Sequence, residues 1–263
     1  MFAGGQNGGK LEGLHLHGKG IGLSILSTAL LNIGSKLGRR LPAQPCQLCG
    51  GSSHDGLCCA ACDAELPRLG TAHCPVCALP TLNGEICGRC LRNPPHFDRT
   101  VAAFSYHFPL NQLIKALKFH EQLVLADFLA DAIIPRIVLR PDVIMALPLH
   151  PARLRIRGFN QSQLLAARIA HRLDIPLLTN VCQRVRDTPP QSSLSWQERD
   201  KNMRKAFAVT ADVDWQGQHI AIVDDVMTSG ASMSALADTV KQSGAGEVSA
   251  WVVARTLPHV GRI

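Results

Sequence analysis

The stretch that most restricts the fold of this chain is HIAIVDDVMTSGAS, which begins at His219. An apolar run, Ile220–Val223, leads into two acidic residues, Asp224 and Asp225. A loop of small residues follows at Thr228–Ser232, and a helical pattern continues beyond it. This order predicts a buried parallel strand, a tight loop at its carboxyl end and a helix N-terminus. In an open α/β sheet, ligands bind at such a place.

The loop residues suit a phosphate group. Gly230 lets the backbone approach an anion, and Thr228, Ser229 and Ser232 offer hydroxyl groups. The free N–H groups and the dipole of the following helix also favour negative charge. The two carboxylates suit sugar hydroxyls, or a magnesium ion that the ligand carries. A phosphorylated ribose uses both halves of the stretch. The alternative is a buried strand that ends in two solvated acids before a capped helix.

The stretch resembles the 5-phosphoribosyl-1-pyrophosphate (PRPP) loop of type I phosphoribosyltransferases. That loop has four apolar residues, two acids, two variable or apolar residues and a Thr/Ser/Gly phosphate cradle, and all are present here. The resemblance implies that Asp224 and Asp225 bind the ribose 2′ and 3′ hydroxyls. Apolar strands followed by paired acids also occur in ATPases, but the sequence has no GxxxxGK[ST] loop. The implied 5′-phosphate ligands are Thr228, Ser229, Gly230, Ala231 and Ser232.

The composition fits a globular protein that interacts with anions. Apolar residues make up 46% of the 263 residues, which is enough for a sizeable core. The formal net charge of +7 suits small phosphates and nucleic acid alike. Aromatic residues are sparse, with one Tyr, three Trp and eight Phe, which weakens an interpretation based on base stacking.

The cysteines predict two metal sites. Eight of the ten cysteines form four C-x-x-C pairs, arranged as two repeats of one unit. Each pair aims two thiolates at one point, and two pairs complete a tetrahedral zinc site with no open position. We therefore predict two structural zinc sites, which supply folding energy to a segment with little core. Redox thiols and disulfides are the alternatives. The predicted ligands are Cys46, Cys49, Cys59, Cys62, Cys74, Cys77, Cys87 and Cys90.

Several features of this cysteine-rich module stay open in the sequence. The ligands can pair sequentially or in a cross-braced arrangement, and Cys58 can replace its neighbour Cys59. We expect His54 and His73 to be surface residues, and Cys182 to be a small core residue. The module can present a surface to a partner or to DNA. Cysteine pairs of this kind predict a reducing cytoplasm.

Residues 1–40 are rich in glycine and irregular up to the apolar run Ile21–Ile33. This run is too short, and too interrupted by Ser and Asn, to span a bilayer, so we expect no stable membrane insertion. We expect a disordered extension; a misassigned start codon is the next interpretation, and a signal or membrane-surface helix is the last.

Beyond the extension we expect a zinc-binding module over residues 41–95 and an α/β domain over residues 96–263. Apolar runs predict strands at 101–108, 143–147, 220–223 and 248–254. Amphipathic patterns predict helices at 110–119, at 124–139 with an interruption at Pro135, from an Asn160 or Ser162 cap to 173, and at 232–243 before Gly244. The alternation of strands and helices predicts a doubly wound, mainly parallel α/β sheet.

Three arginines, Arg153, Arg155 and Arg157, follow the strand at 143–147. We expect them in a loop at the carboxyl end of that strand. Arg offers forked donors to oxyanions, so this loop is a candidate anion site. A solvated run of charge is the alternative.

Three further stretches resemble the ComF family: LKFH from Leu117, RGFNQSQLLA from Arg157, and RDTPPQSSLSWQERDKNMRKAF from Arg186. The cysteine pattern matches that family as well. The resemblance covers roughly residues 41–257 and looks closest to the enterobacterial GntX branch. It implies a link to the use of external DNA as a nutrient, or to natural competence as in other members.

The resemblance also implies a flexible hood loop over residues 187–204, a pyrophosphate-binding loop over residues 147–158, and Mg–PRPP as ligand. Three functions stay open: an active phosphoribosyltransferase, a non-catalytic sensor of PRPP or a nucleotide, and a factor that processes single-stranded DNA. Single-stranded DNA and DNA-uptake proteins are the candidate macromolecular partners. The sequence identifies neither a general base nor an acceptor. The implied pyrophosphate-loop residues are Pro148, Leu149, His150, Arg153, Arg157 and Gly158.

Overall fold

The computed structural model describes residues 44–258 except 55, 187–204 and 212. The chain divides into two compact units, Met1–Ala43 and Gln44–Ile263, and the second is the one described below. The predicted N-terminal extension and the predicted hood loop therefore lie outside the described residues. None of the helices in the described ranges has the length and apolar character needed to cross a membrane.

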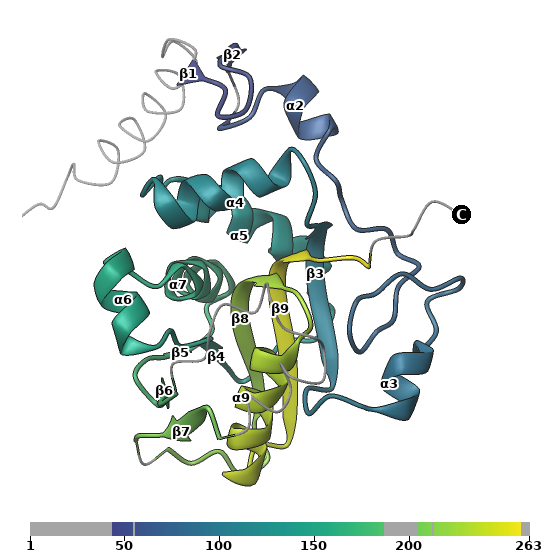
Figure 1. Cartoon of the computed structure of the whole chain (residues 1–263), viewed down its shortest axis with the longest axis vertical. Coiled ribbons are helices and arrows are strands. Elements are labelled where there is room, and N and C mark those ends of the chain that lie inside the picture. Colours follow the sequence, from purple (N-terminus) through teal and green to yellow (C-terminus); the bar gives the residue numbers. More distant parts are fainter. Residues whose placement is uncertain (1–43, 55, 187–204, 212, 259–263) are drawn as a thin grey trace, which may run out of the picture. The chain divides into compact units, whose positions relative to one another are not determined.

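A five-stranded sheet forms the centre of the second unit (Figure 1). Its order is β3, β9, β8, β4, β5, and every neighbouring pair is parallel. Strands β8 and β9 are apolar and buried along most of their length, as expected for parallel strands that are covered on both faces. The strands are β3 Arg99–Ser105, β4 Val143–Ala146, β5 Leu177–Leu178, β8 His219–Met227 and β9 Glu247–Arg255.

Helices cover both faces of the sheet, which confirms the predicted doubly wound α/β fold. Side chains alternate across a strand, so β8 contributes Ala221 and Val223 to one core, and Ile220 and Ile222 to the other. The first core also holds α4, α5 and α7, whereas the second holds α9. The helices are α4 Leu110–Phe119, α5 Leu125–Ile133, α7 Gln161–Leu173 and α9 Ala231–Gln242.

The helices follow the predicted patterns closely. Leu110, Leu113, Ile114 and Leu117 of α4 recur at helical spacing, and all four are buried. Helix α5 gives way to the 3₁₀ helix η2, Ile134–Arg136, at the predicted proline interruption.

Strands β4 and β8 are neighbours, but the chain leaves them toward opposite faces. Strand β4 continues through α6, Pro151–Arg157, into α7, whereas β8 leads into α9. The register pairs Ala146 with Val223, and the N–H of Leu147 donates to the carbonyl of Val223 at 2.9 Å. The carboxyl ends of β4 and β8 therefore lie side by side, and the connections that follow them diverge. Doubly wound proteins bind ligands in the crevice that forms at such a place.

The cysteine-rich segment packs against the sheet at β3. The N–H of Thr100 donates to the carbonyl of Pro75 at 3.0 Å, and its hydroxyl donates to the carbonyl of Val76 at 2.6 Å. Elsewhere, a short antiparallel pair flanks residues 187–204; it consists of β6 Cys182–Arg184 and β7 Phe207–Val209. The segment itself contains β1 Gln44–Pro45, β2 Ser52–Ser53, α2 Ala60–Ala64 and α3 Gly88–Arg92.

Candidate functional site

The paired acids lie inside β8, because the strand continues past the predicted apolar run to Met227. Asp224 is partly exposed, whereas Asp225 is only 3% exposed. Helix α7 reaches both carboxylates from its first turn, through Gln161 and Ser162. The two acids and the start of α7 therefore form one polar cluster at the divergence of β4 and β8.

Asp225 is paired with a lysine of α4. The Lys118 ammonium forms an ion pair with Oδ2 of Asp225, and Nε2 of Gln161 lies 3.4 Å from Oδ1. Burial pushes the pKa of Asp225 upward, but the charge of Lys118 outweighs burial and lowers that pKa overall. Burial likewise lowers the pKa of Lys118, but the charge of Asp225 outweighs it and leaves the lysine pKa raised. Both groups are therefore ionised at neutral pH.

Asp224 differs in its protonation. Burial, followed by the charge of Asp225, raises the pKa of Asp224 from 3.8 to about 7. The Ser162 hydroxyl and the N–H of Asp225 each donate to Oδ1 of Asp224 at 2.8 Å. A ligand that brings hydroxyl donors or a cation stabilises the ionised form, because both favour negative charge.

The small-residue loop joins β8 to α9 through a left-handed glycine. Gly230 occupies the N-cap position of α9 with φ 86°, a conformation that side chains other than glycine rarely adopt. Ser229 is buried, and its hydroxyl accepts a hydrogen bond from the N–H of Ala231 at 3.3 Å. Ala231 and Ser232 form the first turn of α9, so the helix begins one residue earlier than predicted. The predicted phosphate cradle thus coincides with an electropositive helix start.

The predicted loop of arginines is wrong, because residues Pro151–Arg157 form helix α6. Proline occupies the first helical position, where its missing N–H costs nothing. Nδ1 of His150 accepts from the N–H of Ala152 at 3.3 Å and caps the helix. Gly158 ends it with φ 80°. Leu147, Pro148 and Leu149 therefore form the short connection between β4 and the helix cap.

Two of the three arginines line a groove beside Lys118, the lysine that pairs with Asp225. Arg153 and Arg157, one turn apart on α6, line a groove of about 240 Å³ together with Lys118 and Phe119. The guanidinium of Arg157 lies 5.4 Å from the centroid of the Phe119 ring. Arg155 is exposed and does not line this groove.

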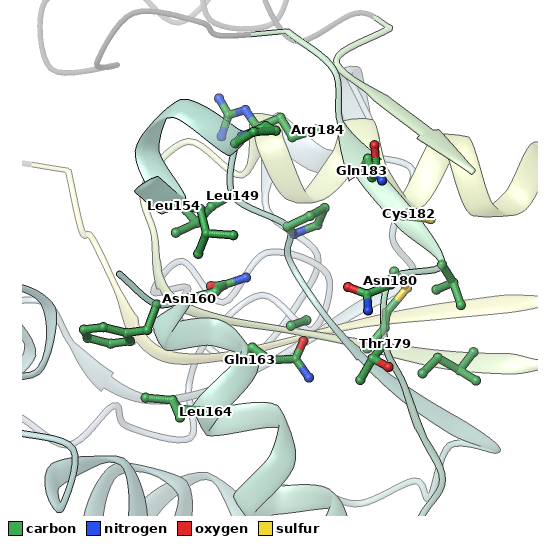
Figure 2. A pocket seen from close by; sticks show the side chains of 17 residues that line it. Leu149, Leu154, Asn160, Gln163, Leu164, Thr179, Asn180, Cys182, Gln183 and Arg184 are labelled. Carbon is green, nitrogen blue, oxygen red and sulfur yellow. The ribbon is translucent and has the colours of Figure 1, made fainter. Parts of the chain in front are cut away.

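A larger cleft of about 640 Å³ lies between the 148–164 segment and the strands β5 and β6 (Figure 2). Figure 2 shows the side-chain amides of Asn160, Gln163 and Asn180 around this cleft, together with the apolar side chains of Leu149 and Leu154. The amide of Asn160 is held by the backbone, since its Nδ2 donates to the carbonyl of Leu147 at 3.0 Å. Its Oδ1 accepts from the N–H of Ser162 at 3.0 Å, which confirms the predicted helix cap.

The cysteines form two clusters with sequential pairing, so the cross-braced alternative is wrong. In each cluster all four thiols lie within 4.8 Å of one another. The sulfur atoms of Cys49 and Cys59 are 3.8 Å apart, and those of Cys77 and Cys87 are 3.6 Å apart. A tetrahedral zinc site with Zn–S of about 2.3 Å has sulfur–sulfur edges of about 3.8 Å, so both clusters fit zinc. The first cluster is Cys46, Cys49, Cys59 and Cys62, and the second is Cys74, Cys77, Cys87 and Cys90.

The cysteines differ in their tendency to ionise, and several residues near the clusters do not belong to them. Burial opposes ionisation of Cys46, but backbone N–H donors outweigh it and lower its pKa to about 6, as a zinc thiolate requires. Burial raises the pKa of Cys58 and of Cys182 to about 11. Cys58, His54 and His73 belong to neither cluster, and Cys182 is buried in the core as predicted.

No family model matches this chain. The "DNA utilization protein YhgH" of Salmonella typhimurium is 35% identical over 221 residues, which cover 81% of this chain and 96% of that protein. The "Competence protein F" of Haemophilus influenzae is 30% identical over 223 residues, which cover 80% of this chain and 96% of that protein. The chain belongs to the ComF family. Among solved structures, a purine phosphoribosyltransferase from Pyrococcus horikoshii aligns with 60% of this ComF chain and 87% of its own, at 19% identity and a TM-score of 0.29.

Two of the stretches that resemble the ComF family meet at the acidic cluster, which sequence reasoning did not anticipate. Lys118 comes from the LKFH motif, and Gln161 and Ser162 come from RGFNQSQLLA. These three residues were not predicted as site residues. The signal was available in the resemblance itself, because LKFH and RGFNQSQLLA were singled out as family motifs while these polar residues within them had no assigned role.

Proposed function

We propose that this ComF protein binds Mg–PRPP, or a related phosphoribosyl ligand, and transfers the phosphoribosyl group to an acceptor. The observation that carries the proposal is the position of Asp224 and Asp225 next to the 228–232 loop, where β4 and β8 diverge. The relatives' names, which refer to DNA utilization and competence, support a role in the uptake or use of DNA.

Each half of the site has a distinct role in this proposal. Asp224, the more accessible acid, makes the first contact with the ribose hydroxyls, and Asp225 binds them while Lys118 keeps it ionised. The loop residues Thr228, Ser229 and Gly230, with Ala231 and Ser232 of the first helical turn, bind the 5′-phosphate.

The pyrophosphate of the ligand lies against α6. Arg153 and Arg157 offer charge from the groove beside Lys118. Backbone groups at Pro148, Leu149 and His150, and the Gly158 turn, complete the region that the family resemblance indicates.

The proposed reaction is a displacement at the anomeric carbon. The bond from that carbon to pyrophosphate breaks, pyrophosphate leaves with the electron pair, and a bond to the acceptor forms. The arginines stabilise the charge that develops on the departing pyrophosphate. The acids lie near the sugar and favour its cationic, oxocarbenium-like character. The cleft of about 640 Å³, with its amide and apolar lining, offers room for the acceptor.

We further propose that each cysteine cluster binds one structural zinc ion. The eight thiols would hold the metal without an open position, so zinc would stabilise the fold and take no part in the reaction. Reliance on reduced thiolates supports a cytoplasmic location.

A second candidate function is the binding of single-stranded DNA. The groove on α6 favours it, because Phe119 is 65% exposed there beside Arg153 and Arg157. Under this function, affinity for an oligonucleotide falls steeply with salt and drops in a variant with Arg153 and Arg157 neutralised.

The deciding experiment measures pyrophosphate release from Mg–PRPP with a panel of nucleobases, beside a direct binding titration with Mg–PRPP. Binding together with acceptor-dependent release supports the transferase. Binding of Mg–PRPP without pyrophosphate release in the presence of any of the nucleobases supports a sensor. If Mg–PRPP does not bind, the phosphoribosyl site itself is contradicted.

A further inference from the structure

Arg255, at the end of β9, is a charged residue in the interior of the protein. Its side chain is among the largest that are fully buried, with 1% of the residue exposed. Arginine is rarely buried to this degree unless partners compensate its charge, because desolvation of a cation is costly. Its partners therefore indicate its role.

The partners of Arg255 are backbone carbonyls from three separate segments. Nε donates to the carbonyl of Cys77 at 2.7 Å. Nη1 donates to the carbonyl of Met227 at 2.9 Å, to that of Thr256 at 2.9 Å, and to that of Thr228. One guanidinium thus joins the second cysteine cluster to the start of the 228–232 loop.

These contacts fix the direction of the loop amides. In a trans peptide, the carbonyl and the following N–H point in opposite directions. Because the carbonyls of Met227 and Thr228 face Arg255, the N–H groups of Thr228 and Ser229 point away from it. A buried cation behind the loop also favours an anion in front of it.

The second cysteine cluster is attached to the sheet through the same short segment. The carbonyls of Pro75 and Val76 accept from Thr100 of β3, and the next carbonyl, that of Cys77, accepts from Arg255. The segment 75–77 is therefore bonded both to β3 and, through Arg255, to the start of the 228–232 loop.

We propose that Arg255 is a positioning residue, which holds the 228–232 loop in its anion-binding conformation and couples that loop to the second cysteine cluster. The proposal rests on the proposed phosphoribosyl site. The donors of Arg255 are directed at backbone carbonyls, so it acts through the loop backbone and not through direct contact with the ligand.

The test compares the affinities of Arg255→Lys and Arg255→Met for ribose 5-phosphate and for inorganic pyrophosphate by calorimetry. We expect the Met variant to lose about tenfold or more in affinity for ribose 5-phosphate, since the loop carbonyls lose their charged hydrogen-bond donor. Pyrophosphate affinity changes less than about twofold, because α6 binds it. The Lys variant keeps the positive charge but loses the several directed donors of the guanidinium. Its affinity for ribose 5-phosphate should therefore lie between those of the wild type and the Met variant.

Arg136→Met is the matched control, because Arg136 also donates to a backbone carbonyl, that of Leu69 at 2.8 Å, but lies apart from the loop. It should leave ribose 5-phosphate affinity unchanged. Equal losses for both ligands in the Arg255 variants indicate a general structural role and overturn the proposal. If the wild type binds neither ligand, the phosphoribosyl site fails; if it binds both and the Arg255 variants match it, only this inference fails.

A measurement on the wild type keeps the test independent of variant folding. Ribose 5-phosphate should slow the chelator-driven loss of zinc from the second cluster about threefold or more, and leave loss from the first cluster unchanged. Equal rates with and without ribose 5-phosphate would contradict the coupling.

Discussion

Asp224 carries the clearest pH dependence in the site, because burial raises its pKa to about 7 from 3.8. Between these values the folded protein holds a proton that the unfolded chain has lost, so stability falls as pH rises through this window. The substitution Asp224→Asn removes this pH-dependent loss of stability, because asparagine does not ionise. It keeps a side-chain oxygen that accepts the hydrogen bond from the Ser162 hydroxyl. We expect the variant to exceed the wild type in unfolding free energy by roughly 2 kcal/mol at pH 8 and to match it near pH 4.

Urea unfolding at several pH values checks this expectation. A variant that is less stable than the wild type at pH 8, or a difference that does not vary with pH, would show that Asp224 is not held in an unfavourable ionised state.

Lys118 holds the second acid, and its removal leaves a buried charge without a partner. We expect Lys118→Met to lower the unfolding free energy by about 3 kcal/mol at pH 7. Adding Asp225→Asn to that variant should restore much of the loss, since both charges are then absent. Lys115→Met, at an exposed position of the same helix, should change stability by less than about 0.5 kcal/mol. Additive effects in this double-mutant cycle would contradict a direct ion pair.

Two of the three arginines of helix α6 line the groove and the third does not, so the third serves as a control for pyrophosphate binding. Arg153→Met and Arg157→Met should each lower pyrophosphate affinity about tenfold, because both line the groove beside Lys118. Arg155→Met should change it less than about twofold, since Arg155 lies outside the groove. Calorimetric titration checks the three variants together, and equal losses in all three would indicate only a diffuse charge effect.

The sequence contained the signals for α6, although the alternating arginines suggested a loop. Pro151 at the first helical position and Gly158 at the end are a standard helix start and stop. Strands β5 and β6 were also missed, because two or three residues carry no readable alternation. The longer elements were predicted well, since buried runs such as Ile220–Val223 have few other placements.

The cysteine clusters connect to the sheet to different degrees, which predicts different consequences of metal loss. Cys74 is 0% exposed and lies in the segment that bonds to β3, whereas Cys49 is exposed. We expect a metal assay to find two zinc ions per chain. Cys74→Ser should lower the Tm by roughly 10 °C, and Cys49→Ser by less than about half of that.

Thermal scans of these two variants, each with its measured zinc content, check the difference. Fewer than two zinc ions in the wild type would contradict the paired structural sites, and a larger effect for Cys49→Ser would contradict the tighter connection of the second cluster.

Across the whole molecule, the sequence predicted the fold class and the metal-ligand sets, but not the contacts that join distant segments. Strand and helix periodicity is local, and so is C-x-x-C spacing, so both are readable along the chain. The approach of Lys118 to Asp225, and of Arg255 to Cys77, depends on how the elements pack. Such long-range pairs have no local pattern in a single sequence.

The most direct measurement is a calorimetric titration of Mg–PRPP into the wild type and into the variant Asp224→Asn with Asp225→Asn. The wild type should bind with a stoichiometry of about one, and the variant should lose at least about a hundredfold in affinity while remaining folded. Equal affinity in the folded variant, or no binding by the zinc-loaded wild type, would contradict a phosphoribosyl site built on these two acids.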